Sequence, residues 1–273
     1  MGKPEIDSPQ NQYVKQFRAL ASKQSRAEQG LMQIEGLRIL QEAMQAGAEI
    51  CWAAFCPDRL TDPKTRAVLE ALRQHGRPIW PMTARAFDAL SDVRGERAFS
   101  HEVRAVCRIP QYRLSDLPAT GRVRIVAVYE LRDPGNMAAM IRSADAFGCA
   151  GVVALEDCVD FFSPKVVRAT AGSVFHLPLV AARWAEFPGW AAQTGVALVA
   201  TAVREGTPFG EVAYPTRTAL LIGSEAHGLP AQVLAAADTV VSVPMPGAAE
   251  SLNAAVAAGI VLYEMTKGSN GGK

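Results

Sequence analysis

Beyond residue 121, short apolar segments alternate with helical patterns, and this alternation constrains the fold more than any other feature. Strands separated by helices form parallel sheets that helices cover on both faces. The expected strands cover 122–129, 151–155, 174–179, 196–201, 218–222 and 240–243. The expected helices cover 137–147, 164–171, 183–193, 230–236 and 252–265. Ligands of such α/β sheets bind beyond the carboxyl ends of the strands, so we look for functional residues there.

The first 118 residues predict a second, smaller α/β domain. Its expected helices cover 12–23, 36–46 and 63–74, and its expected strands cover 31–34, 50–55, 78–81 and 102–108. The sequence SDLPATG at 115–121 is rich in turn-forming residues and predicts the boundary. We therefore expect domains at 1–118 and 119–267, followed by a flexible glycine-rich tail at 268–273.

Composition and missing motifs exclude several classes of protein. Hydrophobic residues make up 49% and charged residues 20%, which is typical of globular proteins. No apolar run approaches the roughly 18 residues that a membrane helix needs, and the N-terminus lacks a signal sequence, so we expect a cytoplasmic protein. The cysteines and histidines show neither C-x-x-C nor H-E-x-x-H spacing, which predicts no metal. The dinucleotide, P-loop and hydrolase-elbow motifs are also absent.

Basic residues cluster in the N-terminal half. One cluster lies in the acid-free stretch between Asp7 and Glu28 and comprises Lys15, Arg18, Lys23 and Arg26. Another lies between residues 85 and 113 and comprises Arg85, Arg94, Arg97, Arg104, Arg108 and Arg113. Such clusters suit a phosphate backbone. Charge alone leaves open the alternative that these are solvated surface side chains.

The first stretch that can carry chemistry is DPGNMAAMIRSADAFG, which follows the strand expected at 122–129. Its Pro-Gly pair predicts a turn, and Asn136 is expected to cap the helix that follows. Arg142 lies off the apolar stripe of this helix, where an arginine can meet an anionic substrate. Pairing with Asp145, three residues along the same helix, is the alternative.

Two further stretches follow later strands. In LIGSEAHGLP, glycines flank a strand end and let the backbone approach a ligand, and Glu225 is either a helix-entry charge or a site carboxylate. In VPMPGAAESLNAAVAAGIVLYE, Ser251 and Asn253 precede a helix rich in alanine and glycine. Both are also ordinary capping residues. The small residues predict unusually close packing of this helix.

Taken together, these stretches resemble the three motifs of the SpoU/TrmH family of RNA ribose 2′-O-methyltransferases, which belong to the SPOUT class. The resemblance covers about residues 122–266 and includes the segment SPKVVRATAG at 163–172. The sequence SKQSRAEQGLMQIEGLRILQEAMQAG resembles the RNA-binding extension of many members, a small fold shared with certain ribosomal proteins. One departure is Ala138, where the family commonly has glycine.

The resemblance implies an α/β fold with a deep trefoil knot near the C-terminus, a rare exception to unknotted topology. It implies that the knot loops bind S-adenosyl-L-methionine with backbone atoms and apolar walls, and that homodimers complete each active site. By position, the donor-binding residues are Thr201, Ala202, Gly223, Ser224, Val243, Met245 and Leu252. Because the domain before the boundary is of a kind that the smallest tRNA enzymes lack, 23S rRNA is the expected substrate.

The resemblance also assigns roles to the motif residues. In the family the arginine at position 142 activates the ribose hydroxyl. An arginine side chain keeps its proton in proteins, so it has no free lone pair with which to act as a base. We therefore interpret Arg142 as stabilising the developing alkoxide. Asn136 and Glu225 would fix Arg142 and the motif loops, and Ser251 and Asn253 would hold the substrate or the third motif.

The expected RNA contacts come from the first basic cluster and from Lys165 and Arg168. The alternatives are a tRNA 2′-O-methyltransferase, an antibiotic-resistance rRNA methyltransferase, and an RNA-binding protein without catalytic activity.

Overall fold

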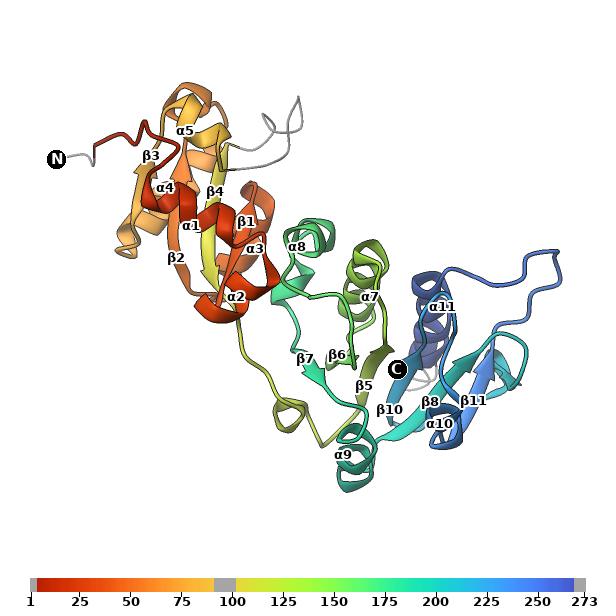
Figure 1. Cartoon of the computed structure of the whole chain (residues 1–273). Coiled ribbons are helices and arrows are strands. Elements are labelled where there is room, and N and C mark those ends of the chain that lie inside the picture. The colour runs from red at the N-terminus through yellow and green to blue at the C-terminus, as the bar shows by residue number, and fades with distance from the viewer. Residues whose placement is uncertain (1–3, 91–101, 268–273) are drawn as a thin grey trace. The chain divides into compact units, whose positions relative to one another are not determined.

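The computed structural model describes residues 4–90 and 102–267, and it divides into two compact units (Figure 1). Unit 1 comprises the described residues of Met1–Pro110 together with Phe162–Phe175. Unit 2 comprises Gln111–Phe161 together with the described residues from His176 onward. The tail at 268–273 and two basic residues of the second cluster, Arg94 and Arg97, lie outside the described residues.

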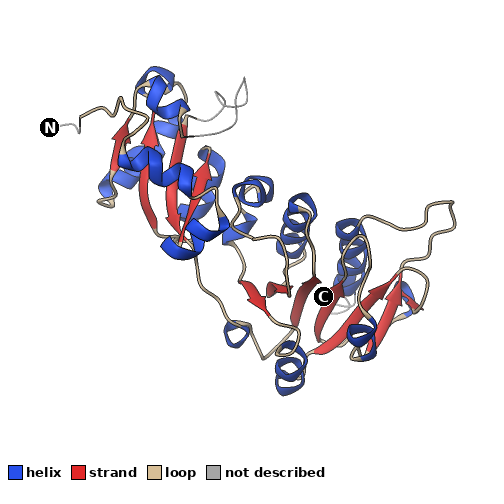
Figure 2. Ribbon diagram, in the orientation of Figure 1, coloured by secondary structure: helices blue, strands red, loops and turns tan. Residues whose placement is uncertain are grey.

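Unit 1 is built on a four-stranded sheet in the order β1-β4-β2-β3, which Figure 2 shows beside its helices. Pairing is antiparallel except between β2 and β3, which are parallel. The strands are β1 (Leu31–Glu35), β2 (Ile50–Phe55), β3 (Ile79–Pro81) and β4 (Val103–Arg108). The helices are α1 (Gln12–Ala19), α2 (Lys23–Gln29), α3 (Leu37–Gln45), α4 (Pro63–Gln74), α5 (Ala84–Asp88) and α8 (Pro164–Thr170), with short 3-10 turns η1 (Pro57–Arg59) and η3 (Ser173–Phe175). These elements confirm the predicted α/β character of the N-terminal half.

The first helix of unit 1 differs from its prediction, because the expected helix at 12–23 ends at Ala19 and a second helix begins at Lys23. Arg26 stabilises the break. Its guanidinium donates to the carbonyls of Leu20 and Ala21, at 2.8 Å each, and its side chain is buried. Arg26 therefore has a structural role in this unit, and its contact with RNA stays a prediction.

Unit 2 is built on a seven-stranded sheet in the order β7-β6-β5-β10-β8-β11-β9, and all of its strand pairs are parallel. The strands are β5 (Val123–Tyr129), β6 (Gly151–Leu155), β7 (Leu179–Ala182), β8 (Ala197–Ala202), β9 (Thr207–Pro208), β10 (Arg217–Ile222) and β11 (Thr239–Ser242). The helices are α7 (Pro134–Ala146), α9 (Phe187–Thr194), α10 (Ala231–Ala235) and α11 (Ala254–Lys267), with 3-10 turns η2 (Leu114–Asp116) and η4 (Phe209–Glu211). The parallel sheet predicted from the alternation is confirmed.

One predicted strand of unit 2 is wrong. The apolar run at 174–179 was expected to be a strand, but η3 occupies its start and β7 begins at Leu179. Gly172 has a φ of +111°, which turns the chain just before this run, and Pro178, which has no N–H to donate, directly precedes β7. Val174 and Leu177 are buried as core side chains without strand pairing.

Helix α7 also begins earlier than expected. Asp133, not Asn136, caps it, because the Asp133 carboxylate accepts the backbone N–H of Asn136 at 2.7 Å. Pro134 follows at the first helical position, where its missing N–H costs nothing. Asn136 therefore lies inside the first turn, and its side chain is available for another partner.

Among the described residues, no helix is long and apolar enough to span a membrane.

Candidate active site

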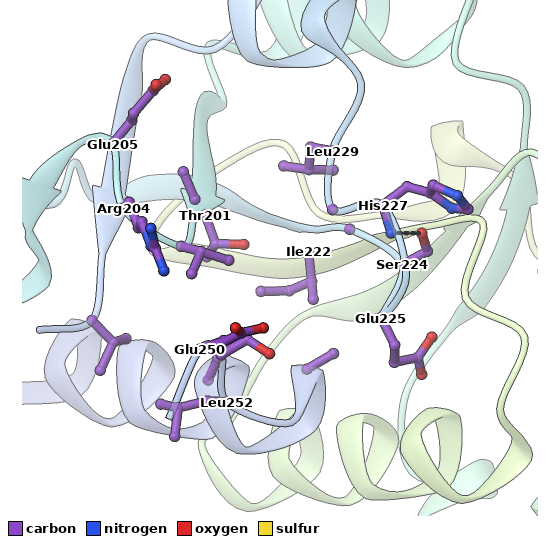
Figure 3. Close-up of a pocket in the computed structure, with 18 of the residues that line it drawn as sticks. Thr201, Arg204, Glu205, Ile222, Ser224, Glu225, His227, Leu229, Glu250 and Leu252 are labelled. Carbon is purple, nitrogen blue, oxygen red and sulfur yellow. Dashed lines mark hydrogen bonds between the residues drawn. The ribbon is translucent and has the colours of Figure 1, made fainter. Parts of the chain in front are cut away.

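A cavity of about 620 Å³ opens at the carboxyl ends of β8, β10 and β11 (Figure 3). Thr201 and Ala202 end β8, Ile222 ends β10, and Val243 follows β11. The remaining wall comes from the loop after β10 and from the start of α11. This is the edge of the sheet at which the sequence predicted a ligand.

All seven residues expected to bind the donor line this cavity, and so do Glu225 and Ser251. They come from three segments far apart in the sequence, which the parallel sheet brings to one edge. Sequence reasoning missed several lining residues that sit beside the predicted ones: Val203, Arg204, Glu205, His227, Leu229 and Glu250. Their positions directly after a strand or inside the second and third motifs were the available signal.

The loop after β10 folds back tightly on itself at Gly223. A Cβ atom on Gly223 would lie 2.1 Å from the carbonyl carbon of Gly228, a distance at which the backbone must move. Ser224 and Gly228 form an isolated antiparallel bridge, and the Ser224 hydroxyl accepts the backbone N–H of His227 at 3.3 Å. Only glycine fits at position 223 without displacing this loop, so its backbone forms part of the cavity wall.

Three side chains join the three motif stretches through a continuous chain of hydrogen bonds. Asn136 Nδ2 donates to Glu225 Oε1 at 2.5 Å, and Asn253 Nδ2 donates to Asn136 Oδ1 at 2.8 Å. Asn253 Oδ1 accepts the N–H groups of Ala255 and Val256, at 2.9 and 3.2 Å, and so caps α11. A carboxylate only accepts, so Glu225 fixes the orientation of both amides in turn. In Figure 3 Glu225 points toward α7, away from the middle of the cavity.

Arg142 is exposed on α7 and is not among the residues that line the cavity. The sequence led us to expect its guanidinium to face this cavity, but within a single chain the structure does not bring the two together. The alternative partner, Asp145, instead contacts His176, whose Nδ1 lies 2.8 Å from Asp145 Oδ2.

The residues expected to bind RNA divide into two groups. The side chains of Lys15, Arg18, Lys23 and Lys165 are exposed. Arg168 is only partly exposed, because its guanidinium pairs with Glu35 at 2.5 Å. Among residues 4–90 and 102–267, no group of three or more His, Cys, Asp or Glu residues is placed to hold a metal.

The cavity fits S-adenosylmethionine in size, lining and charge. Its volume lies within the range of pockets that bind ligands of this size, about 300–1,000 Å³. Ile222, Leu229 and Leu252 supply apolar walls. Apart from Glu225, which is bonded to Asn136, the carboxylates of Glu205 and Glu250 outnumber the one guanidinium, that of Arg204, along the cavity. This balance favours a ligand with a positively charged sulfonium and ammonium.

Comparison with known proteins places the chain among RNA methyltransferases. Residues 123–263 match the family model of the SpoU rRNA Methylase family, and residues 11–95 match the MRM3-like substrate binding domain. The 23S rRNA (guanosine(2553)-2′-O)-methyltransferase of Bacillus subtilis is 31% identical over 96% of this chain and 98% of its own length. The 23S rRNA (uridine(2479)-2′-O)-methyltransferase of Streptomyces viridochromogenes is 31% identical over 94% of this chain and 90% of its own.

A solved structure agrees with these relatives. The AdoMet-bound rRNA methyltransferase from Sinorhizobium meliloti superposes with a TM-score of 0.87 at 29% identity, covering 97% of this chain and 98% of that one. The agreement therefore extends over both units. The cavity, the hydrogen-bonded motifs and these matches agree with one another. The chain belongs to the SpoU rRNA methylase family.

Proposed function

We propose that this protein transfers a methyl group from S-adenosylmethionine to a ribose 2′-hydroxyl of 23S rRNA. The observation that carries the proposal is the hydrogen-bond chain from Glu225 through Asn136 to Asn253, which ties the three motif stretches together at the cavity. The resemblance in unit 1 supports ribosomal RNA as substrate, because the 23S rRNA relatives match nearly the whole chain. This substrate supports a cytoplasmic location.

The bound donor would supply a methyl group already activated on a positively charged sulfur, so the protein's task is chiefly positioning. We assign the donor contacts to the backbone at Gly223 and Ser224 and to the apolar side chains of Val243, Met245 and Leu252. Ser251 lines the cavity beside Leu252, and we assign it to hold the ribose. The knot that the family resemblance implies belongs to this proposal.

The position of Arg142 outside its own cavity leads us to propose a homodimer in which this arginine acts on the partner's cavity. Helix α11 exposes two large apolar side chains, Val256 and Tyr263, at 51% and 55%. A hollow of about 720 Å³ lies between α7 and α11, lined by these residues and by Ala139 and Phe147. Burying this apolar surface would favour dimerisation. Arg142 would then stabilise the developing alkoxide across the interface.

Transfer of labelled methyl groups to unmodified 23S rRNA tests the reaction itself. We expect incorporation that 2′-O-methyl mapping assigns to one site, and that is missing in rRNA from a strain lacking the protein. The two 23S rRNA relatives modify different nucleotides at equal identity, so mapping supplies the target. Incorporation into tRNA alone, or RNA binding without any transfer, would overturn the proposal.

Co-expression of two inactive variants tests the role of Arg142. Arg142→Ala should abolish turnover while donor binding stays nearly intact, and Gly223→Val should abolish donor binding. If Arg142 acts on the partner, each mixed dimer contains one complete site, and the statistical mixture should recover about a quarter of wild-type activity. No recovery would place Arg142 in its own chain's site, and near-normal turnover of Arg142→Ala alone would remove its catalytic assignment.

A further inference from the structure

The central part of the connection between β6 and β7 belongs to unit 1, although both strands belong to unit 2. These strands are parallel neighbours, and the helix that crosses between two such strands ordinarily packs on their own sheet. Here residues Phe162–Phe175 group with unit 1, where α8 contacts β1 and η3 contacts α3. The crossover segment, as we call residues 162–175, is therefore a part of unit 1 that is covalently joined at both ends to unit 2.

The packing of the crossover segment in unit 1 is close. Val166, Val167 and Thr170 of α8 are almost completely buried. Gly172, with its φ of +111°, leaves no space for a side chain, because a Cβ there would lie 2.4 Å from Glu42 Cγ of α3. The segment is thus fitted to unit 1 by shape and by apolar contact.

An array of charges with two buried members, Glu35 and Arg104, adds a specific anchor. Arg168 Nη1 of α8 lies 2.5 Å from Glu35 Oε1 of β1, and Glu35 Oε2 lies 3.9 Å from Arg104 Nε of β4. Glu35 and Arg104 are 7% and 1% exposed. Asp88 attracts Arg104 and is itself paired with Arg59 at 2.5 Å. Five charges of alternating sign therefore run through unit 1, and Arg168 is the end that belongs to the crossover segment.

The other side of the crossover segment leads to the catalytic helix α7. Within unit 2, the residues that follow β6 are hydrogen-bonded to the residues that precede α7. Val159 N–H donates to the Leu131 carbonyl at 2.8 Å, and the Leu131 N–H donates to Cys158 Sγ at 3.3 Å. Leu131 is two residues before Asp133, the cap of α7. These contacts join the chain that enters the crossover segment to the residues just before the helix that carries Asn136 and Arg142.

We propose that Arg168 is a positioning residue: its ion pair with Glu35 holds the crossover segment on unit 1, so that RNA bound to unit 1 sets the position of α7 for methyl transfer. This inference rests on the proposed function. It also reassigns Arg168, which the sequence suggested as an RNA contact. A phosphate contact would change RNA affinity, whereas a positioning contact changes turnover.

The test compares full-length Arg168→Ala and Arg168→Lys with Lys165→Ala, an exposed residue of the same helix. Removing Arg168 leaves Glu35 beside Arg104, so no buried carboxylate loses its last partner. With unmodified 23S rRNA, we expect Arg168→Ala to lower kcat by about 5-fold or more, within the usual range of coupling between sites. Its RNA Kd, the salt dependence of that Kd and donor affinity should stay close to wild type, and Arg168→Lys should recover most of kcat.

Lys165→Ala supplies the contrasting pattern, which is weaker RNA binding with a salt slope reduced by about 1. If Arg168→Ala shows that pattern, or leaves kcat unchanged, the inference is overturned. Hydrogen exchange gives a second measurement, since the amides of 131–137 should exchange faster in Arg168→Ala than in Lys165→Ala, and equal rates would also contradict it. Failure of the proposed function is a separate result, because the wild-type protein would then transfer no methyl groups.

Discussion

Asn253 offers the sharpest test of the hydrogen-bond chain, because its two ends do different work. Its Oδ1 caps α11 by accepting from Ala255 and Val256, and its Nδ2 donates to Asn136. Asn253→Ala removes both functions. Asn253→Asp keeps the acceptors that cap the helix but removes the donor, and it places a second carboxylate beside an amide that already serves Glu225.

The expected stability changes follow from these contacts. Loss of a helix cap costs about 0.5–2 kcal/mol, and loss of a neutral hydrogen bond about 0.5–1.5 kcal/mol. Because Asn253 is exposed, the lower halves of these ranges apply, and Asn253→Ala should cost about 1–2 kcal/mol. Asn253→Asp should stay within about 1 kcal/mol of wild type, since a carboxylate at a helix N-terminus gains about 0.3–1 kcal/mol.

In Asn253→Ala and Asn253→Asp, we expect turnover to fall by more than the changes in stability alone would predict. Both variants remove the donor to Asn136 Oδ1 and leave Asn136 held by Glu225 alone. A reacting group misplaced by about 1 Å can lose on the order of 10²-fold in rate. Urea denaturation at fixed protein concentration measures the stability change, and labelled-methyl transfer measures turnover. Wild-type turnover in Asn253→Asp would show that the donor to Asn136 is dispensable and that Asn253 only caps α11.

Three further outcomes are expected. Gly223→Ala should abolish donor binding in calorimetry, because the added methyl group collides with backbone at 2.1 Å, and normal binding would show that this loop is not part of the donor site. Neutralising three exposed basic residues together, Lys15, Arg18 and Lys23, should lower the apparent salt slope of RNA binding by about 2. An unchanged slope would show that these three residues do not contact the RNA. A hydrogen bond from Arg59 lowers the pKa of Asp88, so its stabilising effect is present above the unfolded-state pKa of about 3.9 and is lost as the pH falls through the lower folded-state pKa. The difference in urea midpoint between wild type and Asp88→Asn should therefore shrink in that acidic range, and a difference that does not change with pH would contradict this account.

The fold was largely predictable, because the alternation of apolar and amphipathic segments determines a parallel sheet whatever the individual side-chain contacts are. The errors arose where the environment overrides local pattern. The apolar run at 174–179 looked like a strand, yet Gly172 turns the chain to fit against Glu42, a contact made across more than a hundred residues of sequence. Periodicity also could not show that α8 packs in unit 1, because its apolar face is compatible with either unit.

The site was predictable where backbone topology alone places residues. Strand ends of a parallel sheet meet at one edge, and all seven expected donor-binding residues lie there. Side-chain partners were not predictable in the same way. Asn136 was expected to cap α7, but Asp133 takes that role and leaves the amide for Glu225. Arg26 and Arg168 counted as positive charges in the sequence, whereas carbonyls and Glu35 engage them in the folded unit.

The order in which this chain is synthesised has consequences for how it folds. Strand β5 pairs with β10, the middle strand of the large sheet, and Val123 and its partner Arg217 are 94 residues apart. Closing so long a loop is entropically costly and slow. The N-terminal unit must itself wait, since α8 leaves the ribosome well after β4 does. A nascent chain that ends before about residue 175 therefore exposes the apolar surface of unit 1 on which α8 packs. We expect it to depend on chaperones until that helix arrives.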